Sequence, residues 1–237
     1  EASSCIAQEA GGEDCPLGSI YVGKVMNVAA NIDAAFVELK RGVKGFLPLG
    51  KGRAIEPLNR PGDGRLLAGD EILVQVEREA VKTKDPVLTT EISLSGRYAV
   101  VIPEREKGTL RFSGKLSGSM KKKIGTALDE CGACEVLSFC SVIVRTNAGE
   151  LEDFAPLAEE INTLAKTAEH MFKTAGSRTC YSCLYRPESV WLREIRDTYF
   201  SQYEEIVTDD TEIYGILKDY LEAGYPERAG RLRFYGD

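Results

Sequence analysis

Short runs in which apolar and polar residues alternate fill the first hundred positions of the chain, and they predict β-strands. These runs cover residues 19–28, 33–39, 44–49, 72–77 and 87–92. Between the third and fourth runs, residues 50–69 contain seven glycines and prolines, which predict a long loop. Five short strands and one long loop within about eighty residues favour a small barrel of the OB type.

Two phenylalanines fall on strand positions that alternation turns away from the barrel interior. Phe36 shares its side of the second strand with Glu38, and Phe46 shares its side of the third strand with Lys44. Outward aromatic rings beside lysines form a surface on which unpaired bases stack. The pair therefore indicates a surface for single-stranded nucleic acid. Rings covered by the barrel rim or by a neighbouring element explain two aromatics alone equally well.

Beyond residue 98 the pattern changes to a mixture of helices and strands. The clearest helix covers residues 151–174, where apolar residues recur at intervals of three and four, and Gly176 ends it. A shorter helix begins at a Ser119 cap, and another covers residues 209–222 with Thr208 as its cap. A further apolar run covers 98–103, and shorter patterns predict strands at 142–144, 183–185, 205–207 and 231–235 and a helix at 189–196.

The charge of the chain narrows the class of ligand. Its formal net charge is −7, which argues against a general binder of polyanions. Residues 18–98, which carry the aromatic pair, are the only net-basic part, with twelve lysines and arginines against ten carboxylates. This excess is small and also fits an ordinary mixed surface. No run approaches the eighteen apolar residues of a membrane span, and no signal peptide is visible.

The cysteines predict a reducing compartment. Seven is an odd number, and their spacing is not that of a secreted disulfide framework, so we expect a cytoplasmic protein. Cys131 with Cys134 and Cys180 with Cys183 form two Cys-x-x-Cys pairs, which suit a structural zinc ion. The gap between the pairs exceeds that of common zinc ribbons, and cysteines in apolar runs serve as small core residues. Zinc is therefore the less favoured interpretation.

Three polar side chains stand where a phosphate can meet them. Lys84 lies in the loop before the fifth strand. Arg145 and Thr146 follow the strand at 142–144, and a guanidinium fork beside a hydroxyl suits a terminal phosphate. Each signal also fits a solvated surface side chain. The only histidine, His170, excludes a two-histidine ribonuclease mechanism, and no catalytic residue is assigned.

Taken in order along the chain, six stretches resemble motifs of the ribonuclease E/G family of bacterial endoribonucleases. They are residues 20–25, 34–37, 45–49, 88–98, 143–146 and 231–235. The resemblance implies an α+β fold. A five-stranded OB-type RNA-binding barrel, of the ribosomal S-one type, is followed by a mixed α/β 5′-sensor and RNase H-like region. The implied boundaries are 1–17 for a linker or remnant RNase H-like strand, 18–97 for the barrel, 98–188 for the 5′-sensor-like subdomain and 189–237 for an RNase H-like segment.

The resemblance also implies roles for particular residues. Those matching the positions that grip single-stranded RNA are Phe36, Phe46 and Lys84. Those matching the pocket for a 5′-monophosphate are Gly96, Val100, Arg145 and Thr146. Asp85 stands where the family usually has glycine, so the Lys84 loop departs from the family pattern.

Through this resemblance the sequence predicts the RNA-binding part of a metal-dependent endoribonuclease that acts in RNA processing or decay. The resemblance also allows the intact enzyme to be a homo-oligomer. The family holds catalytic magnesium with aspartates of a nuclease-like domain, which would begin after Asp237 and would also supply an arginine of the 5′-phosphate pocket. We therefore predict that this chain alone has no nuclease activity. The alternative is a non-catalytic RNA-binding or regulatory protein, with or without a stabilising zinc ion.

Overall fold

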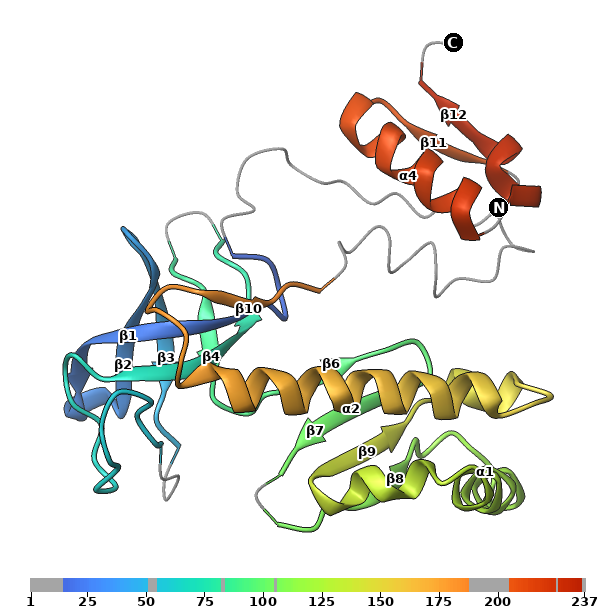
Figure 1. Cartoon of the computed structure of the whole chain (residues 1–237). Helices are drawn as coiled ribbons and strands as arrows, with labels where there is room; N and C mark the ends of the chain where they lie inside the picture. Colours follow the sequence, from blue (N-terminus) through green and yellow to red (C-terminus); the bar gives the residue numbers. More distant parts are fainter. Residues whose placement is uncertain are drawn as a thin grey trace. The chain divides into compact units, whose positions relative to one another are not determined.

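The computed structural model describes residues 15–50, 55–81, 84–104, 106–187, 205–224 and 226–235. It divides the chain into two compact units, one of residues 7–187 and one of residues 1–6 together with 188–237. In Figure 1 the larger unit contains a barrel, a second sheet and the long helix α2 (Ala155–Ala175). All seven residues with a predicted RNA-binding role lie in this larger unit.

The barrel is built from five strands in the OB-type order. They are β1 (Ile20–Ala29), β2 (Ala34–Lys40), β3 (Val43–Pro48), β4 (Glu71–Arg78) and β5 (Val87–Thr89). Antiparallel pairing joins β1 to β2, β2 to β3 and β5 to β4, while β3 and β5 run parallel. The pairing of β1 with β4 closes the barrel, which confirms the predicted five-stranded barrel.

Strand β1 is long because it pairs with β4 along its first half and with β2 along its second half. A bulge between Val25 and Asn27 shifts its register against β2, and such bulges bend and twist a strand. At Gly23 an added Cβ would come within 2.5 Å of Val37 Cγ1, so only glycine fits there. The side chains that fill the barrel core are Tyr21, Val25, Val37, Leu39, Leu47, Ile72, Val74, Val76 and Leu88.

The fifth strand ends earlier than the sequence predicts. It stops at Thr89, and the backbone of Ser93 pairs with a side chain and not with a strand. Ser93 donates its N–H to Gln75 Oε1 at 2.9 Å, and Gln75 Nε2 donates to the Ser93 carbonyl oxygen at 2.8 Å. The buried Gln75 amide thus satisfies the backbone of Ser93, just after the predicted end of the strand.

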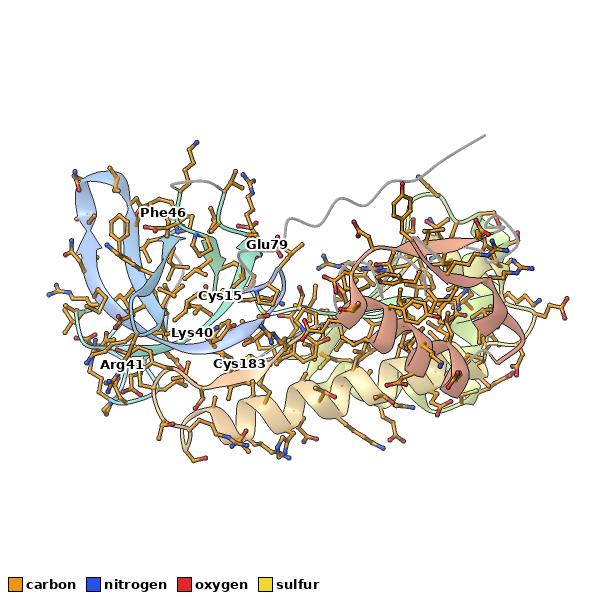
Figure 2. The ribbon with its side chains drawn as sticks, turned by 90° about the horizontal axis from the view of Figure 1, so that it is seen from above. Cys15, Lys40, Arg41, Phe46, Glu79 and Cys183 are labelled. Carbon is orange, nitrogen blue, oxygen red and sulfur yellow. The ribbon has the colours of Figure 1, made fainter. Side chains whose placement is uncertain are left out.

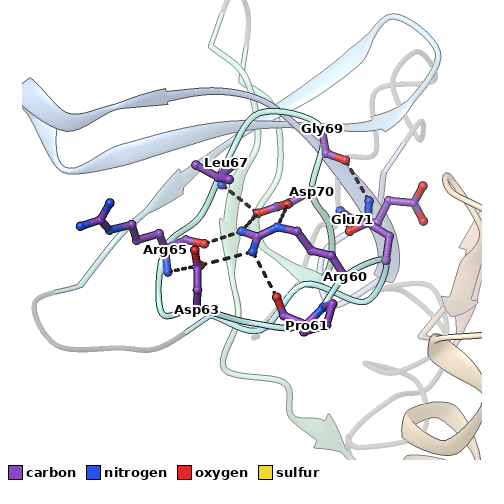
Figure 3. A network of polar contacts seen from close by, with 9 residues as sticks. Arg60, Pro61, Asp63, Arg65, Leu67, Gly69, Asp70 and Glu71 are labelled. Atoms are coloured by element: carbon purple, nitrogen blue, oxygen red, sulfur yellow. Dashed lines mark hydrogen bonds and ion pairs between the residues drawn. The ribbon is translucent and has the colours of Figure 1, made fainter.

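The long loop between β3 and β4 is organised around one ion pair (Figure 3). Arg60 Nε donates to Asp70 Oδ1 at 2.6 Å, and a second guanidinium nitrogen donates to Asp70 Oδ2 at 2.9 Å. The same guanidinium binds the carbonyl oxygen of Arg65 at 2.7 Å and the Asp63 carboxylate at 3.2 Å. Because Asp70 is only 3 % exposed, this two-pronged pair holds the loop against the start of β4.

A four-stranded sheet forms the second part of the larger unit. Its order is β6 (Leu94–Ser95), β7 (Ala99–Pro103), β9 (Cys140–Val144) and β8 (Leu110–Phe112). Neither β6 nor β8 is predicted from the sequence. The helix α1 (Gly118–Glu130) is capped by Ser117, whose Oγ accepts the N–H of Met120 at 3.2 Å, and the predicted cap at Ser119 is wrong.

Helix α2 joins the two sheets of the larger unit. Pro156 stands in its first turn, where no backbone N–H is needed, and Gly176 ends it as predicted. The first half of α2 packs on the second sheet, and its last turns pack on β1 and on β10 (Cys183–Tyr185), a sixth strand that pairs with β1. The buried side chains at this second contact include Ile20 of β1 and Ala168 and Met171 of α2.

The smaller unit, over residues 205–224 and 226–235, is a pair of parallel strands with a helix. The strands are β11 (Ile206–Thr208) and β12 (Leu232–Phe234), and the helix is α4 (Thr211–Gly224). Asp210 Oδ1 accepts the N–H groups of Glu212 and Ile213, so Asp210 caps α4 and the predicted Thr208 cap is wrong. A short 3₁₀ helix (Pro226–Arg231) precedes β12.

Several predictions reach beyond these ranges. The helix at 189–196 and residues 1–14 lie outside the described residues. The RNase H-like assignment of the smaller unit, and the subdomain boundaries within the chain, stay predictions. In the part of the chain that the structure describes, no helix is long and apolar enough to cross a bilayer.

Candidate nucleic-acid interface

The two phenylalanines singled out by alternation form a cross-strand pair. Phe36 on β2 lies directly opposite Phe46 on β3, and their ring centroids are 5.9 Å apart at an interplanar angle of 68°. Their sequence neighbours Val37 and Leu47 belong to the barrel core, so both rings lie on the outer face. An edge-to-face pair of this kind contributes about 0.5–1.5 kcal/mol beyond simple burial, which fixes the rings before any ligand arrives.

The loop that carries Lys84 is held beside this pair. Phe46 donates its N–H to the carbonyl oxygen of Pro86 at 2.8 Å and bridges to Val87, so the segment before β5 runs along β3. Lys84 and Val81 exchange backbone hydrogen bonds of 3.0 and 3.3 Å, which form an isolated antiparallel bridge. The Lys84 side chain is exposed two residues before Pro86. The backbone of the Lys84 segment therefore runs beside the strand that carries Phe46.

Charged side chains surround the aromatic pair. Glu38 lies two residues beyond Phe36 on the same face of β2, with Lys24 opposite it on β1 and Lys44 opposite it on β3. Arg41 follows directly after β2, and Figure 2 shows it on the barrel but apart from Phe46. We call the group Lys24, Phe36, Glu38, Lys44 and Phe46 the barrel face. It holds more positive than negative charge, as a phosphate-binding surface requires.

Glu38 is tied to a residue that sequence analysis missed. Tyr181 Oη donates to Glu38 Oε2 at 2.6 Å, and Gly42 donates its N–H to Glu38 Oε1 at 2.9 Å. These two hydrogen bonds, the first most strongly, lower the pKa of the Glu38 carboxyl. The tyrosine stands 143 residues from Glu38 in the sequence, and no local pattern links them.

The four residues predicted to bind a 5′-phosphate meet at one end of the second sheet. Val100 lies on β7, which pairs with β9, and Arg145 and Thr146 directly follow β9. Arg145 donates its N–H to the carbonyl oxygen of Tyr98 at 2.7 Å, which ties it to the turn that contains Gly96. The Thr146 hydroxyl is 2.9 Å from the hydroxyl of Ser113. The four residues thus come from two segments, 96–100 and 145–146, that adjacent strands bring together.

The turn at Gly96 is shaped by a carboxylate that the sequence did not reveal. Glu160 of α2 accepts the N–H groups of Arg97, Tyr98 and Ala99 at 2.8, 2.7 and 2.9 Å. A Cβ on Gly96 would overlap this carboxylate, so the position requires glycine. Three convergent amides are an anion site, and here the protein's own carboxylate fills it. The three amides are therefore already occupied by Glu160.

Comparison with known proteins shows the family of this chain. A sequence model of the Ribonuclease E/G family matches residues 93–237, which is more than half of the chain. The chain belongs to the ribonuclease E/G family. Ribonuclease E of Escherichia coli (strain K12) is 28% identical over 235 residues, covering 96% of this chain and 22% of that protein.

Two further ribonuclease E/G relatives show the same coverage pattern. Ribonuclease E of Nostoc sp. is 30% identical over 217 residues, which are 87% of this chain and 30% of the relative. Ribonuclease G of Haemophilus influenzae is 25% identical over 236 residues, which are 92% of this chain and 45% of the relative. The chain thus spans less than half the length of each of these relatives.

The two Cys-x-x-Cys pairs of this ribonuclease E/G family member do not meet. Cys131 and Cys134 lie at the end of α1 and in the turn after it, whereas Cys180 and Cys183 lie before and in β10. Burial raises the pKa of the Cys134 thiol to about 11, so it stays protonated at neutral pH. Among the described residues no three His, Cys, Asp or Glu side chains are grouped to hold a metal ion.

Proposed function

We propose that this chain is the single-stranded RNA-binding and 5′-monophosphate-sensing portion of a ribonuclease E/G-like endoribonuclease that acts in RNA processing or decay. The observation that carries the proposal is the Phe36–Phe46 pair, fixed edge to face on the outer side of an OB-type barrel. Bases of any sequence have flat faces that stack on such rings, so the surface suits unpaired RNA without strong sequence preference.

The positive charges around the pair support RNA as the ligand. Lys44 lies on the same face as the rings, and Lys84 lies two residues before Pro86, whose carbonyl oxygen accepts the N–H of Phe46. The Lys84 side chain is exposed, so a phosphate can reach its ammonium group. In this proposal the rings hold bases while these lysines contact the backbone between them.

Arg145 and Thr146 are proposed to hold the 5′-monophosphate, with Gly96 and Val100 shaping the pocket. Arg145 is half-buried, and its backbone is fixed by the hydrogen bond to Tyr98. A guanidinium presents parallel N–H donors that match two phosphate oxygens, and the neighbouring Thr146 hydroxyl adds a third donor. A 5′-hydroxyl end lacks these acceptors, so the pocket would distinguish the two ends.

The decisive experiment compares short RNAs that differ only at the 5′ end. Binding of eight-nucleotide RNAs with a 5′-monophosphate or a 5′-hydroxyl is measured by fluorescence anisotropy. We expect the monophosphate RNA to bind more tightly, and Arg145→Ala to remove that difference. Phe36→Ala should weaken both RNAs about fivefold or more, whatever their base sequence, because stacking contributes about 1–3 kcal/mol per base.

A matched control separates stacking from the loss of any surface aromatic. Phe172 of α2 is 47 % exposed but lies outside the barrel face, so Phe172→Ala should leave RNA affinity unchanged. Affinity that is equal in wild type and Phe36→Ala, with both proteins folded, rejects the RNA-binding proposal. The chain alone should also leave RNA intact in the presence of magnesium. Cleavage by the pure chain would refute the prediction that it has no nuclease activity of its own.

A further inference from the structure

Tyr181 reaches the outer side of the barrel from the segment between α2 and β10. Its N–H donates to the carbonyl oxygen of Val22 at 2.8 Å, and Val22 donates its own N–H to Ser182 at 3.0 Å. The segment is therefore fixed to β1 by backbone hydrogen bonds on both sides of Val22. This attachment places Tyr181 beside strands that precede it by more than 140 residues.

The backbone of Tyr181 adopts a conformation that tyrosine avoids. Its φ is 71°, in the left-handed region, which costs about 1–2 kcal/mol for a residue with a side chain. Glycine or asparagine adopts this region more easily. Strain of this kind persists where the surroundings hold it, and it gathers at functional sites. Here the surroundings hold both ends of the residue, the backbone through Val22 and the phenol through Glu38.

The phenol ends on the barrel face. Glu38 lies two residues from Phe36 on the same side of β2, a separation of about 7 Å. The hydrogen bond of 2.6 Å from Tyr181 Oη to Glu38 therefore sets the phenol on the barrel face, on the other side of Glu38 from the Phe36–Phe46 pair. Tyr181 is half-buried, as are both phenylalanines, so each ring keeps an accessible part.

The charges around Glu38 are positive on balance, which suits the phosphate groups of an RNA backbone. Lys24 and Lys44 lie opposite Glu38 on the two neighbouring strands. Arg41 comes three residues after Glu38, in the turn that follows β2. The hydrogen bond to Glu38 raises the pKa of Tyr181 to about 12, so the phenol remains a neutral donor at physiological pH. One carboxylate thus anchors the tyrosine while three cations outweigh its charge.

We infer that Tyr181 is a third stacking residue for single-stranded RNA, which extends the base-binding surface from the Phe36–Phe46 pair across Glu38. The inference rests on the proposed RNA-binding function and deepens it. It gives the strained backbone a physical reason, because the left-handed turn brings an aromatic ring to the β1 side of the barrel face. Leu39 and Val37 on the same strand point into the core and cannot serve this purpose.

Two substitutions at position 181 separate the ring from the backbone. Tyr181→Asn removes the ring and suits the left-handed φ, whereas Tyr181→Phe keeps the ring and loses only the hydroxyl. Binding of a ten-nucleotide oligoadenylate with a 5′-hydroxyl to the 237-residue chain is measured by anisotropy, with Phe36→Ala as reference. Tyr181→Asn should weaken binding about fivefold or more, and Tyr181→Phe by less than about threefold.

The outcomes distinguish this inference from the proposed function. If Phe36→Ala weakens binding and Tyr181→Asn does not, Tyr181 has no stacking role and only this inference fails. If neither substitution weakens binding, the RNA-binding function itself fails. Photocrosslinking of 4-thiouridine RNA to the wild-type chain gives an answer that does not depend on the stability of the variants. Crosslinks at Tyr181 support the inference, and crosslinks at Phe36 without any at Tyr181 overturn it.

Discussion

The Gly96→Ala substitution tests whether the turn after β6 is shaped by the carboxylate of Glu160. The backbone of Gly96 is not left-handed, so alanine adds no backbone strain there. Its Cβ, however, would overlap Glu160 Oε1 and Cδ and lie 2.9 Å from Cγ, and the carboxylate must move. That movement breaks the hydrogen bonds from the N–H groups of Arg97, Tyr98 and Ala99.

The size of the loss follows from these three bonds. A hydrogen bond to a charged acceptor contributes about 1.5–3 kcal/mol when buried, and less at a half-buried site such as Glu160. We expect Gly96→Ala to lower the free energy of unfolding by about 2–4 kcal/mol, and Glu160→Ala by a similar amount. The double variant should be no less stable than Glu160→Ala alone, because the methyl group then has room. The two effects are therefore strongly non-additive.

Urea unfolding of the four proteins, followed by circular dichroism, measures this coupling. Gly125→Ala in α1 is the matched control, because its Cβ would meet only Phe112 Cζ at 3.9 Å, and alanine there should stabilise by up to about 1 kcal/mol. If Gly96→Ala lowers the free energy of unfolding by the same amount, within about 0.5 kcal/mol, in the wild type and in Glu160→Ala, the steric account of Gly96 is refuted.

Three further changes test other parts of the molecule. Asp70→Asn should destabilise the chain by about 3 kcal/mol at pH 7, because it leaves the Arg60 guanidinium without its buried counter-charge. Since the Arg60 hydrogen bonds lower the pKa of Asp70, the wild type loses this stability as the pH falls below about 4, and the variant should show a flatter acid limb in urea titrations. Arg145→Lys loses the guanidinium fork, so the preference for a 5′-monophosphate should fall about tenfold while 5′-hydroxyl binding stays constant in anisotropy assays. Lys84→Ala should reduce the slope of log affinity against log salt by about 0.7, and an unchanged slope excludes a phosphate contact.

The sequence predicted features that repeat over neighbouring residues. The two-residue period of β2 and β3 placed Phe36 and Phe46 outside the barrel and Val37 and Leu47 inside, as the structure has them. The apolar face of α2 was also predicted, since apolar residues recur at intervals of three and four along its 21 residues. Such patterns depend on local geometry alone, so a single chain suffices to find them.

Contacts between distant segments could not be predicted in this way. Glu160 stands about sixty residues from the turn it holds, and nothing in the helix sequence distinguishes it from the exposed Glu159 beside it. Tyr181 and Glu38 are equally remote, and a left-handed φ at tyrosine contradicts local preference. Tertiary packing decided both cases, and both lie at the proposed binding sites, where local rules fail most often.

Helix α2 explains why these two missed contacts belong together. Near its start, Glu160 holds the turn next to Arg145, and directly after its end the chain continues into Tyr181 and β10. The 15 residues from Glu160 to Ala175 span about 22 Å of helix, so the pocket proposed for the 5′-phosphate and the barrel face are held apart by a fixed spacer. A 5′-phosphate can then add to stacking affinity only in RNAs long enough to reach both sites. Shorter RNAs should bind one site or the other, without the gain from linking them.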